Sequence, residues 1–175
     1  MEKKTVFKWF WAWQDEAEEA WLRKMAQQGW HLAEVGIFGV YSFAAGEPRD
    51  SIYRLDFQSP PKKELSNYLQ LFRDAGWEHI GSMASWQYFR KPVQDGEEAE
   101  IFTDAASKIA KYRRVIMFLL ITGFPLLWMV GDRSTAWQGV RLSLDVALRA
   151  FGFIILVIYV FSFVNLARRI RQLRK

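Results

Sequence analysis

The sequence predicts an α+β fold in which a tandem β-α-β-β repeat with an antiparallel sheet is followed by a two-helix transmembrane hairpin. Three observations support this prediction: an uneven charge distribution, two uncharged runs near the C-terminus, and a strand–helix–strand–strand pattern that occurs twice. The chain has 175 residues, enough for one ordinary domain and a membrane segment. It contains no Cys, which excludes disulfides, thiolate metal sites and a cysteine nucleophile.

The charge is divided between two parts of the chain. Residues 1–107 carry 12 Lys and Arg against 17 Asp and Glu, a net charge of −5. Residues 108–175 carry 12 against 2, a net charge of +10. A nucleic-acid-binding domain needs a basic patch of its own. We therefore expect no nucleic acid as a partner of the acidic front part.

The first repeat begins with alternating aromatic residues. Residues 6–13 predict a strand that carries on one face the rings of Phe7, Trp9, Trp11 and Trp13. A helix follows, with Asp15 as its cap and Glu18 completing a capping box. Gly29 ends this helix in the left-handed conformation. The repeat is completed by two short strands, at 30–35 and 40–44.

The second repeat has the same order of elements. We expect a strand at 52–57, a helix that begins at Ser59-Pro60 and ends at Gly76, and strands at 77–83 and 85–91. A shift of 47 residues places Gly29 on Gly76 and Trp30 on Trp77. We expect the two units to share a curved sheet with both helices on one side. Chance similarity between two amphipathic helices is the alternative.

Two uncharged runs near the C-terminus predict the hairpin. They span residues 115–131 and 150–167, and a membrane-spanning helix needs roughly 17–25 apolar residues. Soluble helices, the alternative, would normally carry a continuous polar stripe. Positive residues precede the first run and follow the second, so both termini are expected on the cytoplasmic side.

These patterns divide the chain into six segments. We predict a cytoplasmic domain at 1–93, an acidic linker with a short juxtamembrane helix at 94–112, transmembrane helices at 113–131 and 149–168, a short external loop at 132–148 and a basic cytoplasmic tail at 169–175.

Several strings of residues also resemble a known family. The most specific are Asp-Ala-Gly-Trp-Glu at 74–78 and Trp-Gln-Tyr-Phe-Arg-Lys at 86–91. They resemble the DUF2812 family, a bacterial group of unknown function, over about residues 5–110. The resemblance implies a location at the bacterial cell membrane and, from neighbouring genes, a PadR-type regulator as a partner. It implies no catalytic residue. Tandem β-α-β-β units are also similar to effector-binding domains of the gyrase-inhibitor group, whose clefts hold small amphipathic compounds, an analogy of fold alone.

An excess of aromatic residues supplies the candidate binding site. Large rings with polar tips line ligand clefts and interaction hot spots, although most rings in any domain belong to its core. The candidates are Trp9, Trp11, Trp30, Tyr53, Trp77, Trp86 and Tyr88, with Arg54, Asp56 and Arg90 as polar members. Strand alternation places Arg90 on the face of Trp86 and Tyr88, at the edge of an aromatic cleft.

Motifs for catalysis or metal binding are absent from the sequence. It contains no phosphate-binding glycine loop and no nucleophile elbow. His31 and His79 follow Gly-Trp pairs at different offsets, so we expect them on opposite faces of equivalent strands, each hydrogen-bonded. The carboxylates of Asp56, Asp74 and Glu78 carry no spacing that pairs them. We therefore expect no cofactor, no metal and no enzymatic activity.

The sequence thus predicts a membrane-anchored cytoplasmic sensing or adaptor protein. Its expected partners are the lipid bilayer and either a small amphipathic ligand or a regulator protein. The alternative is an accessory or structural subunit of a membrane protein complex, in which the hairpin makes the specific contacts. An enzyme is the third and least supported hypothesis.

Overall fold

The computed structural model describes residues 2–93, 100–102, 105–131 and 142–174. Residues 94–99, 103 and 104 of the predicted linker and residues 132–141 of the predicted external loop lie outside these described residues. The chain forms two units, Met1–Lys111 and Tyr112–Lys175. Each unit is described by itself below.

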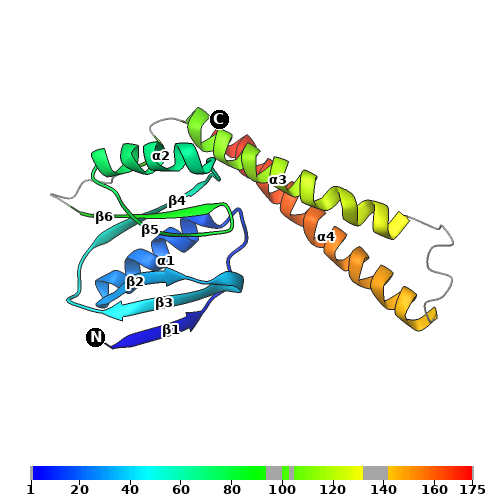
Figure 1. Ribbon diagram of the computed structural model, residues 1–175, viewed down its shortest axis with the longest axis horizontal. Helices are drawn as coiled ribbons and strands as arrows, with labels where there is room; N and C mark the ends of the chain where they lie inside the picture. The colour runs from blue at the N-terminus through cyan, green and yellow to red at the C-terminus, as the bar shows by residue number, and fades with distance from the viewer. Residues whose placement is uncertain (1, 94–99, 103–104, 132–141, 175) are drawn as a thin grey trace. The chain divides into compact units, whose positions relative to one another are not determined.

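The first unit contains the two repeats (Figure 1). The first repeat consists of β1 (Lys3–Phe7), α1 (Asp15–Gln27), β2 (Trp30–Val35), the short 3-10 helix η1 (Ile37–Gly39) and β3 (Val40–Ala45). The second consists of β4 (Ser51–Phe57), α2 (Lys62–Asp74), β5 (Glu78–Met83) and β6 (Trp86–Pro92). Both repeats pair their strands antiparallel and in the same order, β1-β3-β2 and β4-β6-β5. The repeated unit is therefore present, as two three-stranded sheets instead of one continuous sheet.

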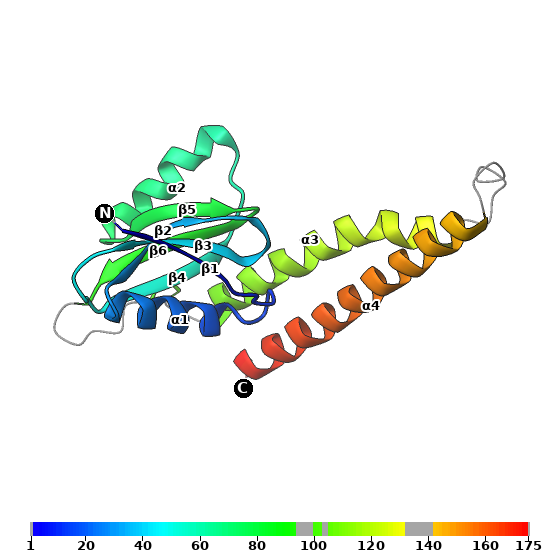
Figure 2. The same ribbon diagram turned by 90° about the horizontal axis from the view of Figure 1, so that it is seen from below.

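The two helices cover opposite faces of the strands, as Figure 2 shows. α1 packs on the face that carries Leu55 and Tyr88, whereas α2 packs on the face that carries Ile52 and Phe89. The rings of Phe72 and Phe89 stack with centroids 4.0 Å apart. The prediction of two helices on one side was wrong because β4 and β6 bury apolar residues on both faces, so each face needs its own cover.

The predicted strand at 6–13 is shorter than expected. β1 ends at Phe7, and the tryptophans that follow lie in the connection to α1. There the rings of Trp11 and Trp13 stack at 5.3 Å. The backbone N–H of Trp11 donates to the side-chain oxygen of Gln14 at 3.0 Å, and the N–H of Gln14 donates to the carbonyl of Trp11 at 2.8 Å. These reciprocal bonds close a turn, which an extended strand cannot accommodate.

The ends of the helices follow the sequence signals only in part. Gly29 and Gly76 have φ values of +83° and +81°, which confirms both predicted left-handed ends. The predicted N-terminal caps were wrong. Gln14 precedes α1 and Pro61 precedes α2, and neither makes a side-chain capping bond.

The second unit holds most of α3 (Ala105–Gly131) and α4 (Leu142–Leu173), which lie side by side in Figure 1. The hydroxyls of Thr122 and Tyr159 lie 3.1 Å apart. A side chain at Gly123 would meet the Tyr159 ring at 2.8 Å, so glycine permits this close approach. Within the described residues, one helical segment, Ala147–Leu173, is long and apolar enough to cross a membrane, with a mean hydropathy of 2.4 over an 18-residue window. This is modest support for membrane association.

Candidate functional site

An open cavity of about 500 Å³ lies where β2 and β5, the neighbouring edge strands of the two sheets, come together. We call it the seam cavity. Its polar lining residues are His31, Glu47, Arg49, Ser51, Glu78, His79 and Arg90. Its apolar lining residues are Leu32, Ala33, Ala44, Ala45, Ile80 and Pro92. Its size falls in the range of small-molecule sites, roughly 300–1,000 Å³, and its mixed lining suits a ligand with both an apolar and a charged part.

Both histidines of the chain line the seam cavity. We expected them on opposite faces of equivalent strands. They lie on β2 and β5, the equivalent strands of the two repeats. The pairing register changes between Leu32 and Glu34 in β2 and between His79 and Gly81 in β5. The predicted hydrogen bonds are present. The Nε2 atom of His31 lies 2.8 Å from the carbonyl oxygen of Glu47, and that of His79 lies 2.9 Å from the side-chain oxygen of Gln87.

Two arginines, balanced in number by Glu47 and Glu78, are the cations that line the seam cavity. The Arg90 guanidinium donates to the carboxylate of Glu78 at 2.7 Å. It also interacts electrostatically with the hydroxyl of Tyr53, which makes no hydrogen bond of ordinary geometry. The side chain of Arg49 is exposed and forms no ion pair with any residue that the structure describes. Arg49 is therefore the cation available to an incoming anionic group.

The predicted site residues are dispersed through the first unit. Tyr53, Trp77 and Tyr88 are buried core residues, and Trp30 and Trp86 pack against the core. Trp9 is half-exposed, while Trp11 stacks on Trp13. Asp56 accepts a hydrogen bond from Tyr68 at 3.0 Å, and Arg54 joins the network described below. Among the ten, Arg90 lines the seam cavity, and it shares the face of Trp86 and Tyr88 as expected.

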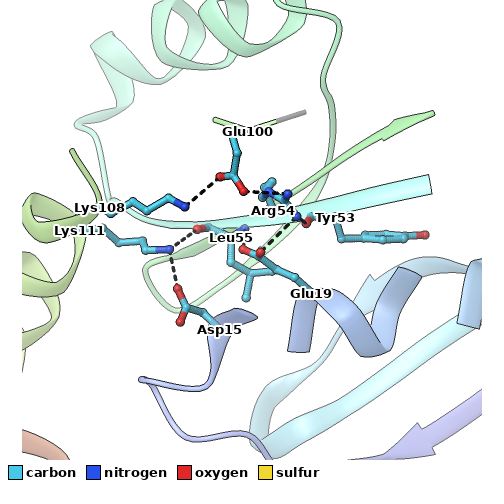
Figure 3. A network of polar contacts seen from close by, with 8 residues as sticks. All are labelled: Asp15, Glu19, Tyr53, Arg54, Leu55, Glu100, Lys108 and Lys111. Atoms are coloured by element: carbon cyan, nitrogen blue, oxygen red, sulfur yellow. Dashed lines mark hydrogen bonds and ion pairs between the residues drawn. The ribbon is translucent and has the colours of Figure 1, made fainter. Parts of the chain in front are cut away.

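A second polar feature joins α1, β4 and the first turns of α3 (Figure 3). We call it the buried network. The Lys111 ammonium donates to the carboxylate of Asp15 at 2.5 Å and to the carbonyl of Leu55 at 3.2 Å. Lys111 and Asp15 are both almost fully buried. Because a buried charge is costly without a partner, this pair stabilises the packing of the first turns of α3, up to Lys111, against the start of α1.

The outer part of the buried network is organised around Glu100. Its carboxylate lies 2.9 Å from Arg54 and 3.4 Å from Lys108. Arg54 also reaches the carboxyl group of Glu19 at 3.4 Å. The Nε atom of Arg54 is buried without a hydrogen-bond partner among the described residues.

Two neighbouring acidic residues of α1 are buried. Burial raises the pKa of Glu19 to about 8, although Lys111 and Arg54 oppose the rise. The Glu19 carboxyl group accepts the backbone N–H of Leu55 at 2.8 Å. Burial also raises the pKa of Glu18. Its Oε1 atom accepts hydrogen bonds from the hydroxyl of Tyr41, at 2.7 Å, and from the hydroxyl of Tyr88, at 2.8 Å.

Sequence reasoning missed the buried network. It assigned Asp15 and Glu18 to helix capping and Lys111 to the basic residues near the membrane. One signal was present: Asp15, Glu18, Leu22 and Met25 recur at the spacing of a single helix face, which predicts burial for the acidic members as well as the apolar ones.

Comparison with known proteins completes the description. Residues 14–124 match the sequence profile of a protein family, DUF2812, that is described as of unknown function. No curated protein and no solved structure matches the chain.

Proposed function

We propose that this chain, which belongs to the DUF2812 family, is a membrane-anchored sensing protein whose first unit binds a small amphipathic ligand in the seam cavity. The seam cavity is the observation that carries the proposal. The apolar part of the ligand lies against Ala33, Ile80 and Pro92. Its anionic group is held by Arg49 and Arg90.

The membrane arrangement in this proposal has two spans. α4 supplies one, and the uncharged run at 115–131 in α3 supplies the other. The positive residues at both flanks favour cytoplasmic termini, and in this proposal the seam cavity faces the cytoplasm of a bacterial cell. The first unit then samples cytoplasmic molecules.

Strand β4 provides a route from the ligand to the membrane segment. Its first residue, Ser51, lines the seam cavity. Three and four residues later, Arg54 and Leu55 belong to the buried network, where Leu55 contacts Lys111 of α3. A ligand that shifts β4 therefore acts directly on the helix that leads toward the membrane. Such a signal requires that β4 can take two positions and that the ligand binds the protein more tightly in one of them than in the other.

Binding is tested with the full chain in detergent micelles against a panel of amphipathic anions and cations. We expect amphipathic anions to raise the melting temperature and to bind saturably. Arg49→Ala should weaken that binding about tenfold, the equivalent of about 1.4 kcal/mol. Arg73→Ala is the matched control, because Arg73 lies in α2 away from the cavity lining. Equal affinities for the Arg49→Ala variant and the unchanged chain, or indifference to the whole panel, would contradict the proposal.

The accessory-subunit hypothesis makes a different prediction. An apolar groove of about 450 Å³ lies between α3 and α4, lined by residues that include Leu119, Phe124, Val160 and Phe163, and it favours a partner helix. Exchange of residues 113–167 for an unrelated two-span anchor separates the two functions. Ligand binding and signalling survive the exchange if the first unit is the sensor, whereas an accessory subunit loses its partner.

A regulator protein, including the PadR type, is the alternative binding partner of the first unit. Its binding should survive the exchange too.

A further inference from the structure

Four large apolar side chains project from one end of the first unit. Phe7 and Trp9 are 70% and 51% exposed, and Ile37 and Phe38 are 68% and 71% exposed. We call this group the aromatic tip. Its two segments are adjacent because Phe7 pairs with Val40 and the N–H of Lys8 donates to the carbonyl of Gly39 at 2.8 Å. A contiguous exposed apolar group of this kind marks an interaction surface.

The backbone holds the aromatic tip in place. Phe38 has φ 57° and ψ 33°, the left-handed conformation that a residue with a bulky side chain rarely adopts. Next to it, Gly39 has φ +76°, and a side chain there would meet the carbonyl oxygen of Lys8 at 2.5 Å. A strained backbone that keeps a phenylalanine ring in solvent points to a function for the ring.

The aromatic tip lies near the point where the chain leaves the first unit. Trp9 is six residues before Asp15, and Asp15 forms the ion pair with Lys111, the last residue of that unit. The uncharged run predicted to span the membrane begins at Val115, only four residues after Lys111. Helical residues rise about 1.5 Å each. The exit point is therefore held close to the lipid surface.

We propose that the aromatic tip inserts into the headgroup region of the membrane that anchors the chain. Trp is enriched at this depth because its ring is apolar while its N–H reaches water, and Phe side chains are buried there in interfacial segments. Lys8, which follows Phe7 directly at the end of β1, adds attraction to anionic lipids. The remainder of residues 1–107 is acidic and would be repelled by such a surface, so the contact is local. The inference rests on the membrane anchoring in the proposed function but not on a ligand.

The absence of Cys allows a direct test in the full chain. Phe38→Cys and Ile37→Cys each carry a nitrobenzoxadiazole label, and the chain is placed in nanodiscs of phosphatidylcholine and phosphatidylglycerol. Leu71→Cys is the matched control, because Leu71 is 70% exposed but lies on α2. Brominated lipid should quench the labels at 37 and 38 at least about twofold more than the label at 71, since interfacial groups are buried roughly 5–10 Å into the membrane surface. Exchange of Phe7 and Trp9 for Ser should reduce that difference.

The outcomes separate this inference from the others. Equal quenching at all three positions, in discs that hold the chain, would overturn insertion of the aromatic tip and leave the anchor intact. A chain recovered outside the disc fraction would overturn the anchor and the insertion together. Ligand binding is measured in the same discs by the melting temperature, and the Phe7 and Trp9 substitutions should leave it unchanged.

Discussion

Glu18 and Glu19 are neighbours in α1, but the protein accommodates their buried carboxyl groups differently. Glu18 accepts hydrogen bonds from two tyrosine hydroxyls inside the apolar core. Glu19 faces the buried network, where it accepts a backbone N–H and lies near two cations. Burial raises both pKa values, so both residues make stability depend on pH.

The first prediction concerns Glu19→Gln. The pKa of Glu19 rises from 4.5 to about 8 on folding, so the folded chain holds this proton more tightly than the unfolded chain. Its contribution to stability is therefore complete below pH 4.5 and is lost as the pH rises to about 8, with a slope of up to about 1.4 kcal/mol per pH unit. Glutamine does not titrate, and its oxygen still accepts the N–H of Leu55.

Thermal unfolding of the full chain in detergent, followed from pH 5 to pH 8, checks this prediction. The unchanged chain should lose stability across this range, and Glu19→Gln should lose distinctly less. Glu16→Gln, a change at an exposed neighbour, should follow the unchanged chain. Parallel curves for all three proteins would refute the assignment.

The second prediction compares two buried tyrosines. Tyr88→Phe removes one of the two donors to Glu18, and loss of a hydrogen bond to a buried polar group costs about 1–3 kcal/mol. The hydroxyl of Tyr53 is equally buried but makes no ordinary hydrogen bond. Tyr53→Phe should therefore change the free energy of unfolding by no more than about 0.5 kcal/mol. Denaturant titration of both variants measures the difference in the free energy of unfolding. Similar losses of stability in the two variants would show that the hydrogen bonds of the Tyr88 hydroxyl do not contribute.

At the scale of elements, one buried ion pair joins the first turns of α3 to the start of α1. Lys111→Met leaves the carboxylate of Asp15 buried without its cation, which typically costs about 3–5 kcal/mol. Lys108→Met breaks only the outer contact with Glu100, and such surface pairs contribute about 0–1 kcal/mol. Melting temperatures of the two variants should therefore differ clearly. If Lys108→Met is the more damaging change, the inner pair does not hold the helix.

Sequence patterns identified most elements of the first unit because local signals dictate them. Gly29 and Gly76 end the helices as predicted, and the alternation in β4 and β6 identifies both strands. The failures lie where tertiary contacts compete with local preference. Asp15 is the type of residue that caps a helix, but its carboxylate instead accepts a hydrogen bond from the ammonium of Lys111, which lies 96 residues away in the sequence. The alternating tryptophans look like a strand, but Gln14 folds them into a turn.

The candidate site was less predictable than the elements. The seam cavity forms where two edge strands from different repeats meet, and no spacing along one strand encodes that meeting. His31 and His79 were singled out in the sequence, yet their shared location depends on two bulges and on the division into two sheets. Arg49 lies in a connection without a motif and gave no signal at all.

At the scale of the whole molecule, the two-span topology makes a prediction about accessibility. A single cysteine at Ser134→Cys, in the predicted external loop, should react with a membrane-impermeant maleimide on intact cells. A single cysteine at Leu71→Cys should react only after lysis. Labelling of position 71 from outside would invert the topology and remove the seam cavity from the cytoplasm.

The opposite placement of the two helices has a consequence for how the first unit opens. Six residues of α1 are buried, whereas no residue of α2 is. Amide hydrogens exchange with solvent through local opening, whose free energy follows the apolar contacts that must be broken. We expect amides of α2 to exchange at least about tenfold faster than those of α1, a difference of about 1.4 kcal/mol. The duplicated unit would then contain one helix that stays closed and one that opens readily, as mass spectrometry of deuterium uptake will show.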